Sequence, residues 1–151
     1  KVFIGQCEDF LDNLPNNHFD AIYFNDVLEH MVDPYSVLDK MKAKLSDNGV
    51  IISSIPNLRY HRVFKELVFD KDFKYKEEGI LDKTHLRFFT KKSIIRMYED
   101  LGYKIISHVG INGEKKIRRT IFKFPDFFKI KEDMKHLQYA TVASKIKNTE
   151  A

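Results

Sequence analysis

Polar side chains that could carry out acid–base or metal chemistry follow a short apolar run near the start of the chain. The apolar run at 21–24 stops at Asn25-Asp26. Glu29 and His30 follow within the next few residues. An abrupt change from apolar to polar residues is typical of a buried strand whose carboxyl end opens onto a polar crevice, and open α/β sheets bind ligands in such crevices. The sequence therefore predicts a site at the end of this strand.

His30 is the first candidate for a general base at that site, because an imidazole titrates near neutral pH. A second imidazole, His85, lies far along the chain, and we predict both as catalytic residues. Together with Asp26 and Glu29 they would provide two carboxylates and two imidazoles, which is a ligand set for a divalent ion such as Mg²⁺. Structural roles are the alternative. His30 could cap or pack against the following helix, and His85 could hydrogen-bond within its own turn.

Strands and helices alternate around these residues. Asp33-Pro34 predicts the start of a helix, with Asp as N-cap and Pro in the first turn, and Gly49 is expected to end it in a left-handed conformation. Thr90 is expected to cap a second helix that Gly102 stops. Strands are predicted at Val2–Gly5, Ala21–Asn25, Val50–Ile55, Tyr103–Val109 and Leu137–Ile146. This order predicts an α/β domain in which the two strands joined by the first helix are parallel neighbours.

Composition limits the class of protein further. A chain of 151 residues can bury one core. The single cysteine, Cys7, fits a reducing compartment, and no apolar run approaches the roughly 18 residues of a membrane span. The net charge of +4 permits an anionic partner without requiring one. We therefore predict a cytoplasmic protein, and nucleic acid is not the partner that we expect for it.

Several runs resemble class I S-adenosylmethionine-dependent methyltransferases of the type 11 and 23 kind. They are Phe19-Asp20, Asp26–His30, Asp33-Pro34, Gly49–Asn57 and Thr84–Thr90, and the resemblance extends from Val2 to about Ile146. It implies a Rossmann-like methyltransferase sheet that is mostly parallel with an antiparallel last strand. It also implies S-adenosylmethionine as the cofactor and O-methylation of a small molecule or sugar.

The same resemblance implies which residues bind the cofactor: Gln6, Cys7, Glu8, Asn25, Asp26, Val27 and Leu28. Gln6 stands where the family often has an acidic residue facing the adenine amino group, and its side-chain carbonyl can accept that hydrogen bond. The chain begins at what resembles the third strand of the family, so the glycine-rich turn of the first strand has no counterpart. We expect an amino-terminally truncated domain that binds the cofactor poorly by itself and is inactive alone.

A second resemblance concerns the metal. Asp26, Glu29, His30 and His85 are similar to the Glu-x-x-Glu-His plus distant His pattern of metal-dependent small-RNA 2′-O-methyltransferases. The first part is also similar to that of ubiquinone-biosynthesis O-methyltransferases. This implies that the four residues are metal ligands, although Asp26 shortens one ligand arm relative to Glu. The other interpretation is that Asp26 and Glu29 hydrogen-bond the cofactor loop.

Two segments lie outside the alternation of strands and helices. Residues 57–89 are expected to cap the crevice, and residues 111–135 to form an insertion before the last strand. Within the insertion, residues 115–131 interleave basic and Phe residues. This composition fits a solvated segment packed on the domain or on a second subunit, a cap on the substrate, or a peripheral contact with a membrane.

Two rival interpretations remain beside the methyltransferase. The chain could be a non-catalytic truncated domain that acts in protein interaction, including a homodimer formed through an exposed sheet edge. It could also be a nicotinamide-dependent Rossmann enzyme. The second rival is disfavoured because no clear crossover helix precedes the last predicted strand, which suits an antiparallel strand.

Overall fold

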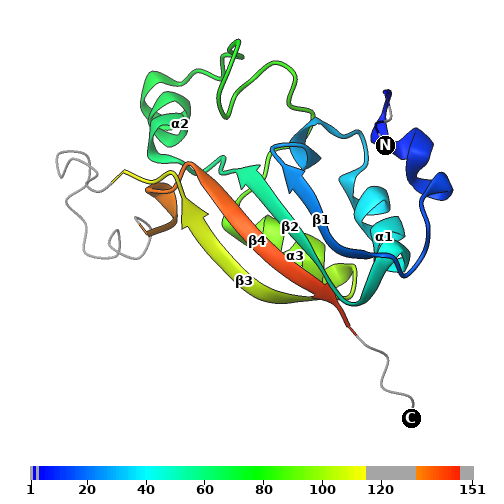
Figure 1. The fold of residues 1–151 in the computed structure, drawn as a ribbon. Helices are drawn as coiled ribbons and strands as arrows, with labels where there is room; N and C mark the ends of the chain where they lie inside the picture. The colour runs from blue at the N-terminus through cyan, green and yellow to red at the C-terminus, as the bar shows by residue number, and fades with distance from the viewer. Residues whose placement is uncertain (1, 3, 115–131, 147–151) are drawn as a thin grey trace.

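A four-stranded sheet forms the centre of the computed structural model, which describes residues 2, 4–114 and 132–146 (Figure 1). The order of the strands is β1-β2-β4-β3. Their bounds are β1 Phe19–Asn25, β2 Leu45–Pro56, β3 Tyr103–Ile111 and β4 Gln138–Lys145. β1 and β2 are parallel, whereas β4 runs antiparallel to both of its neighbours. The predicted parallel pair and the predicted antiparallel last strand are both confirmed.

Two helices, α1 (Pro34–Lys44) and α3 (Lys91–Asp100), lie behind the sheet in the view of Figure 1. Asp33 caps α1 by accepting hydrogen bonds from the backbone N–H groups of Tyr35 and Ser36. Thr90 caps α3 in a reciprocal arrangement with Ser93. Both predicted caps are confirmed. No helix in the described part of the chain is long and apolar enough to cross a membrane.

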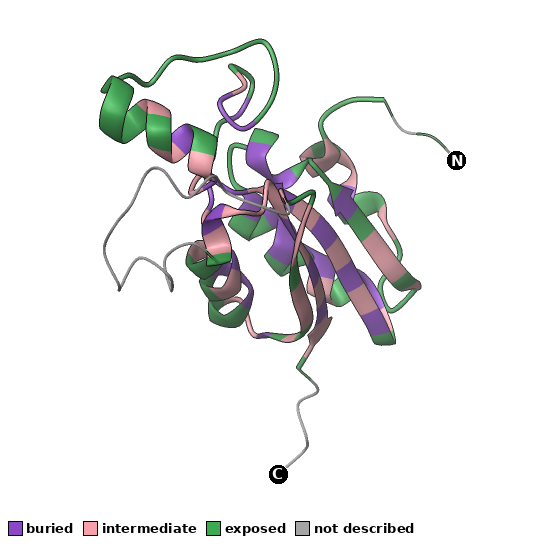
Figure 2. Ribbon diagram, turned by 90° about the vertical axis from the view of Figure 1, so that its left-hand side faces the viewer, coloured by how far each residue is buried: buried purple, intermediate pink, exposed green. Residues whose placement is uncertain are grey.

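The core lies between the sheet and these two helices. Burial alternates along β2, where Ile51, Ser53 and Ile55 are buried. The alternation shows as bands of colour along the strands in Figure 2. The hydroxyl of Tyr98 on α3 donates to Ser53 Oγ at 2.8 Å, and the hydroxyl of Tyr103 donates to a backbone carbonyl of α1 at 2.6 Å. These bonds give the buried hydroxyl groups of Tyr98, Ser53 and Tyr103 hydrogen-bond partners.

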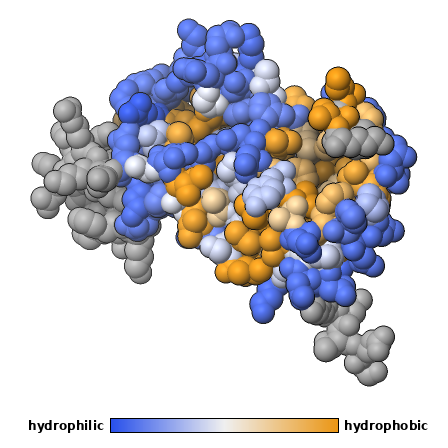
Figure 3. Space-filling view, viewed as in Figure 1, coloured by the Kyte–Doolittle hydropathy of each residue, from blue (hydrophilic) through white to orange (hydrophobic). Residues whose placement is uncertain are grey.

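The opposite face of the sheet is turned toward the viewer in Figures 1 and 3. Tyr23, Ile52 and Val142 are lateral neighbours in three adjacent strands and share this face. Tyr23 is 62% exposed. Apolar surface accordingly shows on this side in Figure 3.

Short elements gather at the edge of the sheet where β1, β2 and β3 end and β4 begins (Figure 1). They include a 3₁₀ turn directly after β1, η2 (Leu28–His30), and a helix after β2, α2 (His61–Lys65), which continues as a π-helix, η3 (Glu66–Asp70). Another 3₁₀ segment, η1 (Cys7–Asn13), precedes β1 and packs on α1.

Two predictions about the backbone are wrong. Of the strand predicted at 2–5, the described residues Val2, Ile4 and Gly5 are not in a strand. Val2 and Ile4 are 86% and 94% exposed, and an apolar run forms a strand only where a neighbour pairs with it. Gly49 does not cap a helix, because α1 ends at Lys44 and Gly49 lies inside β2. A Cβ atom at Gly49 would lie 2.5 Å from the carbonyl oxygen of Phe19, so the close approach of β1 explains the glycine.

Candidate functional site

The site begins where β1 ends. Asp26 adopts a left-handed conformation with φ of 52°, and its N–H donates to the carbonyl of Ser54 on β2 at 3.1 Å. The chain then turns into η2, whose first residue, Leu28, is completely buried in the core. This anchor places Glu29 in the interior at 1% exposure and leaves His30 exposed at the surface.

A second segment is held against η2 by backbone hydrogen bonds. The N–H groups of Leu86 and Arg87 both donate to the carbonyl oxygen of Glu29, at 2.8 and 3.0 Å. The guanidinium of Arg87 also donates to the carbonyl of Val32, with Nε at 3.0 Å. These bonds bring His85, which is 8% exposed, to the end of β1.

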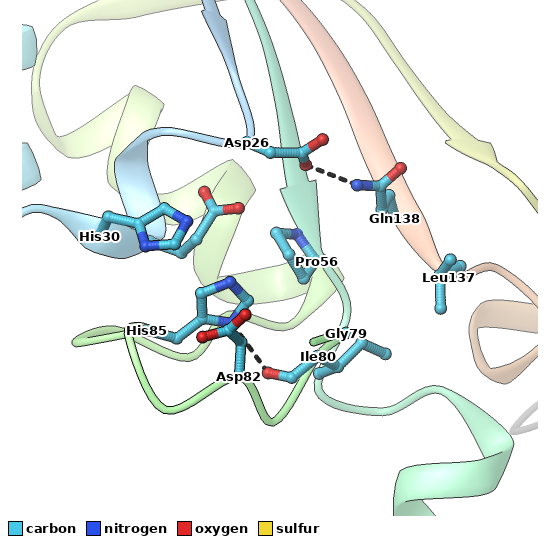
Figure 4. Close-up of a pocket in the computed structure, with 10 residues that line it drawn as sticks. Asp26, His30, Pro56, Gly79, Ile80, Asp82, His85, Leu137 and Gln138 are labelled. Atoms are coloured by element: carbon cyan, nitrogen blue, oxygen red, sulfur yellow. Dashed lines mark hydrogen bonds between the residues drawn. The ribbon is translucent and has the colours of Figure 1, made fainter. Parts of the chain in front are cut away.

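Glu29, His30 and His85 converge as a result. One potential ligand atom from each lies within 4.8 Å of the other two. The rings of His30 and His85 meet edge to face, with centroids 4.7 Å apart (Figure 4). The structure thus brings together three of the four residues that were predicted as metal ligands.

Each imidazole is oriented through its Nδ1 atom. His85 Nδ1 lies 2.9 Å from the carbonyl oxygen of Ile80, and His30 Nδ1 lies 3.2 Å from the carbonyl oxygen of Thr84. A carbonyl oxygen only accepts, so in a neutral ring each Nδ1 carries the proton and Nε2 keeps a lone pair. This is the arrangement in which histidine binds metals or accepts a proton.

Glu29 has the least ordinary environment of the three. Both of its carboxylate oxygens are buried and have no hydrogen-bond partner within the described residues. Burial raises the pKa of Glu29 to about 7, and the neighbouring charge of Asp26 adds to the rise. An unpaired buried carboxylate is destabilising, which is typical of a group kept for a ligand.

Asp26, the fourth predicted ligand, lies in the same cleft but outside this three-residue cluster. Its carboxylate accepts a hydrogen bond from the side-chain amide of Gln138, as Figure 4 shows. Gln138 in turn accepts a hydrogen bond from the amide of Asn112 at 2.7 Å. The first residue of β4 and the residue after β3 therefore hold Asp26 in place.

The cleft around these side chains has a volume of about 230 Å³. Its lining residues are Asp26, Glu29, His30, Pro56, Gly79, Ile80, Asp82, His85, Leu137 and Gln138. Sequence reasoning missed Gln138, Ile80 and Asp82. Asp82 lies three residues before a predicted site histidine, which is a weak local signal. Gln138 has no such signal, because it reaches the cleft only through the pairing of β4 with β2.

The residues predicted to bind the cofactor occupy two places. Asn25, Asp26 and Val27 are exposed at the end of β1, whereas Leu28 points its side chain into the core. Gln6, Cys7 and Glu8 lie at the start of η1. Their roles stay predictions.

Cys7 packs against the core as a half-buried side chain. Burial, followed by the charge of Glu8, raises the pKa of its thiol to about 12. A thiol with so high a pKa is a poor nucleophile.

The family model of a methyltransferase domain matches residues 2–108. The chain belongs to the methyltransferase-domain family. No curated protein matches the chain. The predicted family is therefore confirmed, and the residues at the end of β1 that line the cleft lie within the matched methyltransferase domain.

Solved structures share the fold of this methyltransferase domain. An S-adenosylmethionine-dependent methyltransferase from Archaeoglobus fulgidus superposes with a TM-score of 0.67 at 17% identity, over 95% of this chain and 67% of its own. A methyltransferase from Thermotoga maritima gives 0.60 at 14% identity, over 88% and 59% of the two chains. The small RNA methyltransferase HEN1 gives 0.55 at 15% identity, over 89% and 15%. The chain thus spans about two thirds of the first structure and less of the other two.

Proposed function

We propose that this methyltransferase domain transfers the methyl group of S-adenosylmethionine to a hydroxyl group, and that Glu29, His30 and His85 hold a divalent cation beside that hydroxyl. The observation that carries the proposal is the buried, unpaired carboxylate of Glu29 next to two imidazoles that are each fixed through Nδ1. Packing alone does not account for such a carboxylate, because burying a charge without a partner destabilises the folded state. A bound cation would supply the missing partner.

The reaction itself makes few demands on the protein. The acceptor oxygen loses its proton and attacks the methyl carbon, and the carbon–sulfur bond breaks with its electron pair left on sulfur, which gives a neutral thioether. The protein has to align the oxygen with the methyl–sulfur bond and assist the loss of the proton. When bound, a divalent cation lowers the pKa of a hydroxyl group, so that the proton is lost near neutral pH.

The donor atoms indicate which cation fits. Glu29 offers oxygen, whereas His30 and His85 each offer an imidazole nitrogen. Mg²⁺ prefers oxygen ligands in octahedral geometry, whereas Mn²⁺ and Co²⁺ bind imidazole more readily. We therefore propose Mn²⁺ or Co²⁺ ahead of the Mg²⁺ that was predicted from the sequence.

The charge of the cleft bears on the acceptor. Its lining includes three carboxylates, on Asp26, Glu29 and Asp82, and none of the ten lining residues is Lys or Arg. A cleft of this charge repels phosphate and carboxylate groups. It favours a neutral hydroxyl compound, such as a small alcohol, a phenol or a sugar.

The cofactor would approach from the end of β1. Asn25, Asp26 and Val27 are exposed there, beside the cleft. Asp26 would then lie between the cofactor and the three-residue cluster of Glu29, His30 and His85. Its bond from Gln138 fixes its carboxylate in that position.

The test is methyl transfer by the full-length protein from labelled S-adenosylmethionine to a panel of neutral hydroxyl compounds that includes pyranosides and catechols. We expect a chelator to abolish transfer and Mn²⁺ or Co²⁺ to restore it. We expect His30→Ala and His85→Ala each to lower the rate at least about 100-fold. His18→Ala, a surface histidine outside the cleft, is the matched control.

Other outcomes separate the alternatives. An enzyme that resists the chelator and loses activity only with His30→Ala uses His30 as a general base without a cation. Full activity in both histidine variants leaves alignment as the only catalytic device. A full-length protein that neither binds S-adenosylmethionine nor transfers methyl groups would instead fit the non-catalytic interaction domain.

A further inference from the structure

His30 needs more to hold it than its own element provides. It is the last residue of η2, a single 3₁₀ turn, and its ring is exposed. The core therefore anchors the turn through Leu28 but does not fix the orientation of the His30 side chain. A ligand or base must be held within a fraction of an ångström to act efficiently, so some other group has to fix this ring.

Thr84 contacts that ring with two of its atoms. Its carbonyl oxygen and its hydroxyl oxygen each lie 3.2 Å from His30 Nδ1. The two residues come from distant parts of the chain, namely the turn after β1 and the segment before α3. Thr84 is itself exposed, so its side chain is not part of the packed core.

Asp82 determines which hydrogen bonds the Thr84 hydroxyl can make. One carboxylate oxygen of Asp82 accepts hydrogen bonds from both the N–H and the hydroxyl of Thr84, each at 2.7 Å. Because the hydroxyl hydrogen points to Asp82, the Thr84 hydroxyl can only accept from His30. These same bonds hold the pKa of Asp82 below its usual range, so the carboxylate stays charged.

We infer that Thr84, oriented by Asp82, is a positioning residue that fixes the His30 ring with its proton on Nδ1 and its lone pair on Nε2. The hydrogen bonds from Asp82 through Thr84 fix the ring of His30, as the carbonyl of Ile80 fixes the ring of His85. Removing the outer partner of a metal-binding histidine lowers metal affinity by about 10- to 100-fold. The inference rests on the proposed function only for the role of Nε2, which would bind the cation or accept the proton. The tautomer of His30 itself is a property of the metal-free protein.

The first test reads the tautomer directly. Long-range ¹⁵N–¹H correlation spectra of the metal-free full-length protein distinguish a proton on Nδ1 from a proton on Nε2. At a pH where His30 is neutral, we expect the Nδ1–H form in the wild-type protein and in Thr84→Ser, which keeps the hydroxyl. We expect a larger share of the Nε2–H tautomer in Thr84→Val, because this variant keeps the backbone carbonyl at 3.2 Å as an acceptor but loses the second acceptor, the hydroxyl. An unchanged tautomer in Thr84→Val would overturn the inference.

The second test is a calorimetric titration of the same proteins with Mn²⁺. Thr84→Val is expected to bind Mn²⁺ at least about tenfold more weakly than the wild type, and Thr84→Ser within about threefold of it. Asp82→Ala should weaken binding in the same direction. Asp70→Ala, which removes a carboxylate from η3 outside the cleft, should leave the affinity unchanged. Equal losses in the Val and Ser variants would show that the hydroxyl is not the cause and would overturn the inference.

The two tests also separate this inference from the proposed function. A wild-type protein that shows the Nδ1–H form and responds to Thr84→Val, but binds no Mn²⁺, would refute the cation and retain Thr84 as the positioning residue of a base. A wild-type protein that binds Mn²⁺ and shows no preference for the Nδ1–H form would support the cation site and refute the role of Thr84. Thermal unfolding of each variant excludes a general loss of folding.

Discussion

The rings of His30 and His85 meet edge to face at 4.7 Å, although one follows β1 and the other precedes α3. This contact follows from backbone hydrogen bonds, because the N–H groups of two residues directly after His85 donate to the carbonyl of Glu29. The peptide groups of two segments thus assemble the cluster, independently of its reactive side chains. Substitutions of those side chains should therefore alter chemistry and leave the fold intact.

Glu29→Gln should make the metal-free protein more stable while it abolishes cation binding. The substitution removes a buried charge that has no partner within the described residues. At pH 8 we expect a melting temperature at least about 2 °C above that of the wild type, from the relief of roughly 1 kcal/mol or more. Differential scanning calorimetry in the presence of a chelator measures this difference in melting temperature. A lower melting temperature for the Gln variant at pH 8 would mean that the carboxylate supports the fold.

The pH dependence of that difference gives a further prediction. The pKa of Glu29 is raised from 4.5 in the unfolded chain to about 7 in the folded protein, so the folded state binds more protons between these values. The free energy of unfolding that Glu29 contributes therefore falls as the pH rises from about 4.5 through 7. The advantage of Glu29→Gln should shrink at pH 5. Melting curves with the same offset at pH 5 and pH 8 would contradict the raised pKa.

His108 predicts the opposite slope. It stacks on Tyr139 with ring centroids 4.8 Å apart, and burial lowers its pKa from 6.5 to about 4. Between these values the unfolded chain binds more protons, so the stability that His108 contributes is lost as the pH falls from about 6.5 toward 4. His108→Phe keeps an aromatic ring and cannot take up a proton. Urea unfolding at pH 7, 5.5 and 4.5 should show a shallower loss for this variant, and parallel losses would contradict the prediction.

Asn57→Ala should destabilise the protein by about 2–3 kcal/mol. Asn57 is completely buried at the end of β2, and its side-chain amide donates to the carbonyl oxygens of Asp133 and His136 at 2.6 and 2.9 Å. Alanine would leave these two carbonyls without that donor, beside the start of β4. Chemical denaturation measures the change, with the exposed Asn13→Ala as the control. A change below about 0.5 kcal/mol would show that water replaces the amide.

Much of the fold follows from local sequence signals. The caps at Asp33 and Thr90 were predictable because side-chain oxygens at helix starts satisfy free N–H groups of their own neighbours. The strands β1, β2 and β4 were predictable because each is an apolar run bounded by polar or turn-forming residues. The strand at residues 2–5 was predicted wrongly, because strand pairing depends on a neighbour that no local pattern reveals.

The candidate site was predictable only in part. Asp26, Glu29 and His30 are close in sequence, and their cluster at a strand end could be read directly. His85 was predicted from its chemistry and from the resemblance, but no local pattern shows its approach to Glu29, which depends on the hydrogen bonds made by Leu86 and Arg87. Gln138 was not predictable, because it meets Asp26 only through the antiparallel pairing of β4 with β2.

The segment at 115–131 lies outside the described residues, so its predicted roles as a packed insertion, a substrate cap or a membrane contact stay predictions. The cap predicted at 57–89 also stays a prediction. Its residues Gly79, Ile80, Asp82 and His85 line the cleft. A full-length variant with residues 115–131 replaced by a short Gly-Ser linker would show whether they affect acceptor affinity.

The most direct test of the central claim is a crystal structure of the full-length protein grown with Mn²⁺, with anomalous data collected at the manganese edge. We predict one anomalous peak in the cleft, with an oxygen of Glu29 and a ring nitrogen of each of His30 and His85 at about 2.0–2.3 Å from it. A cleft without a peak at saturating Mn²⁺, or a Glu29 carboxylate paired with a protein donor instead, would contradict the claim.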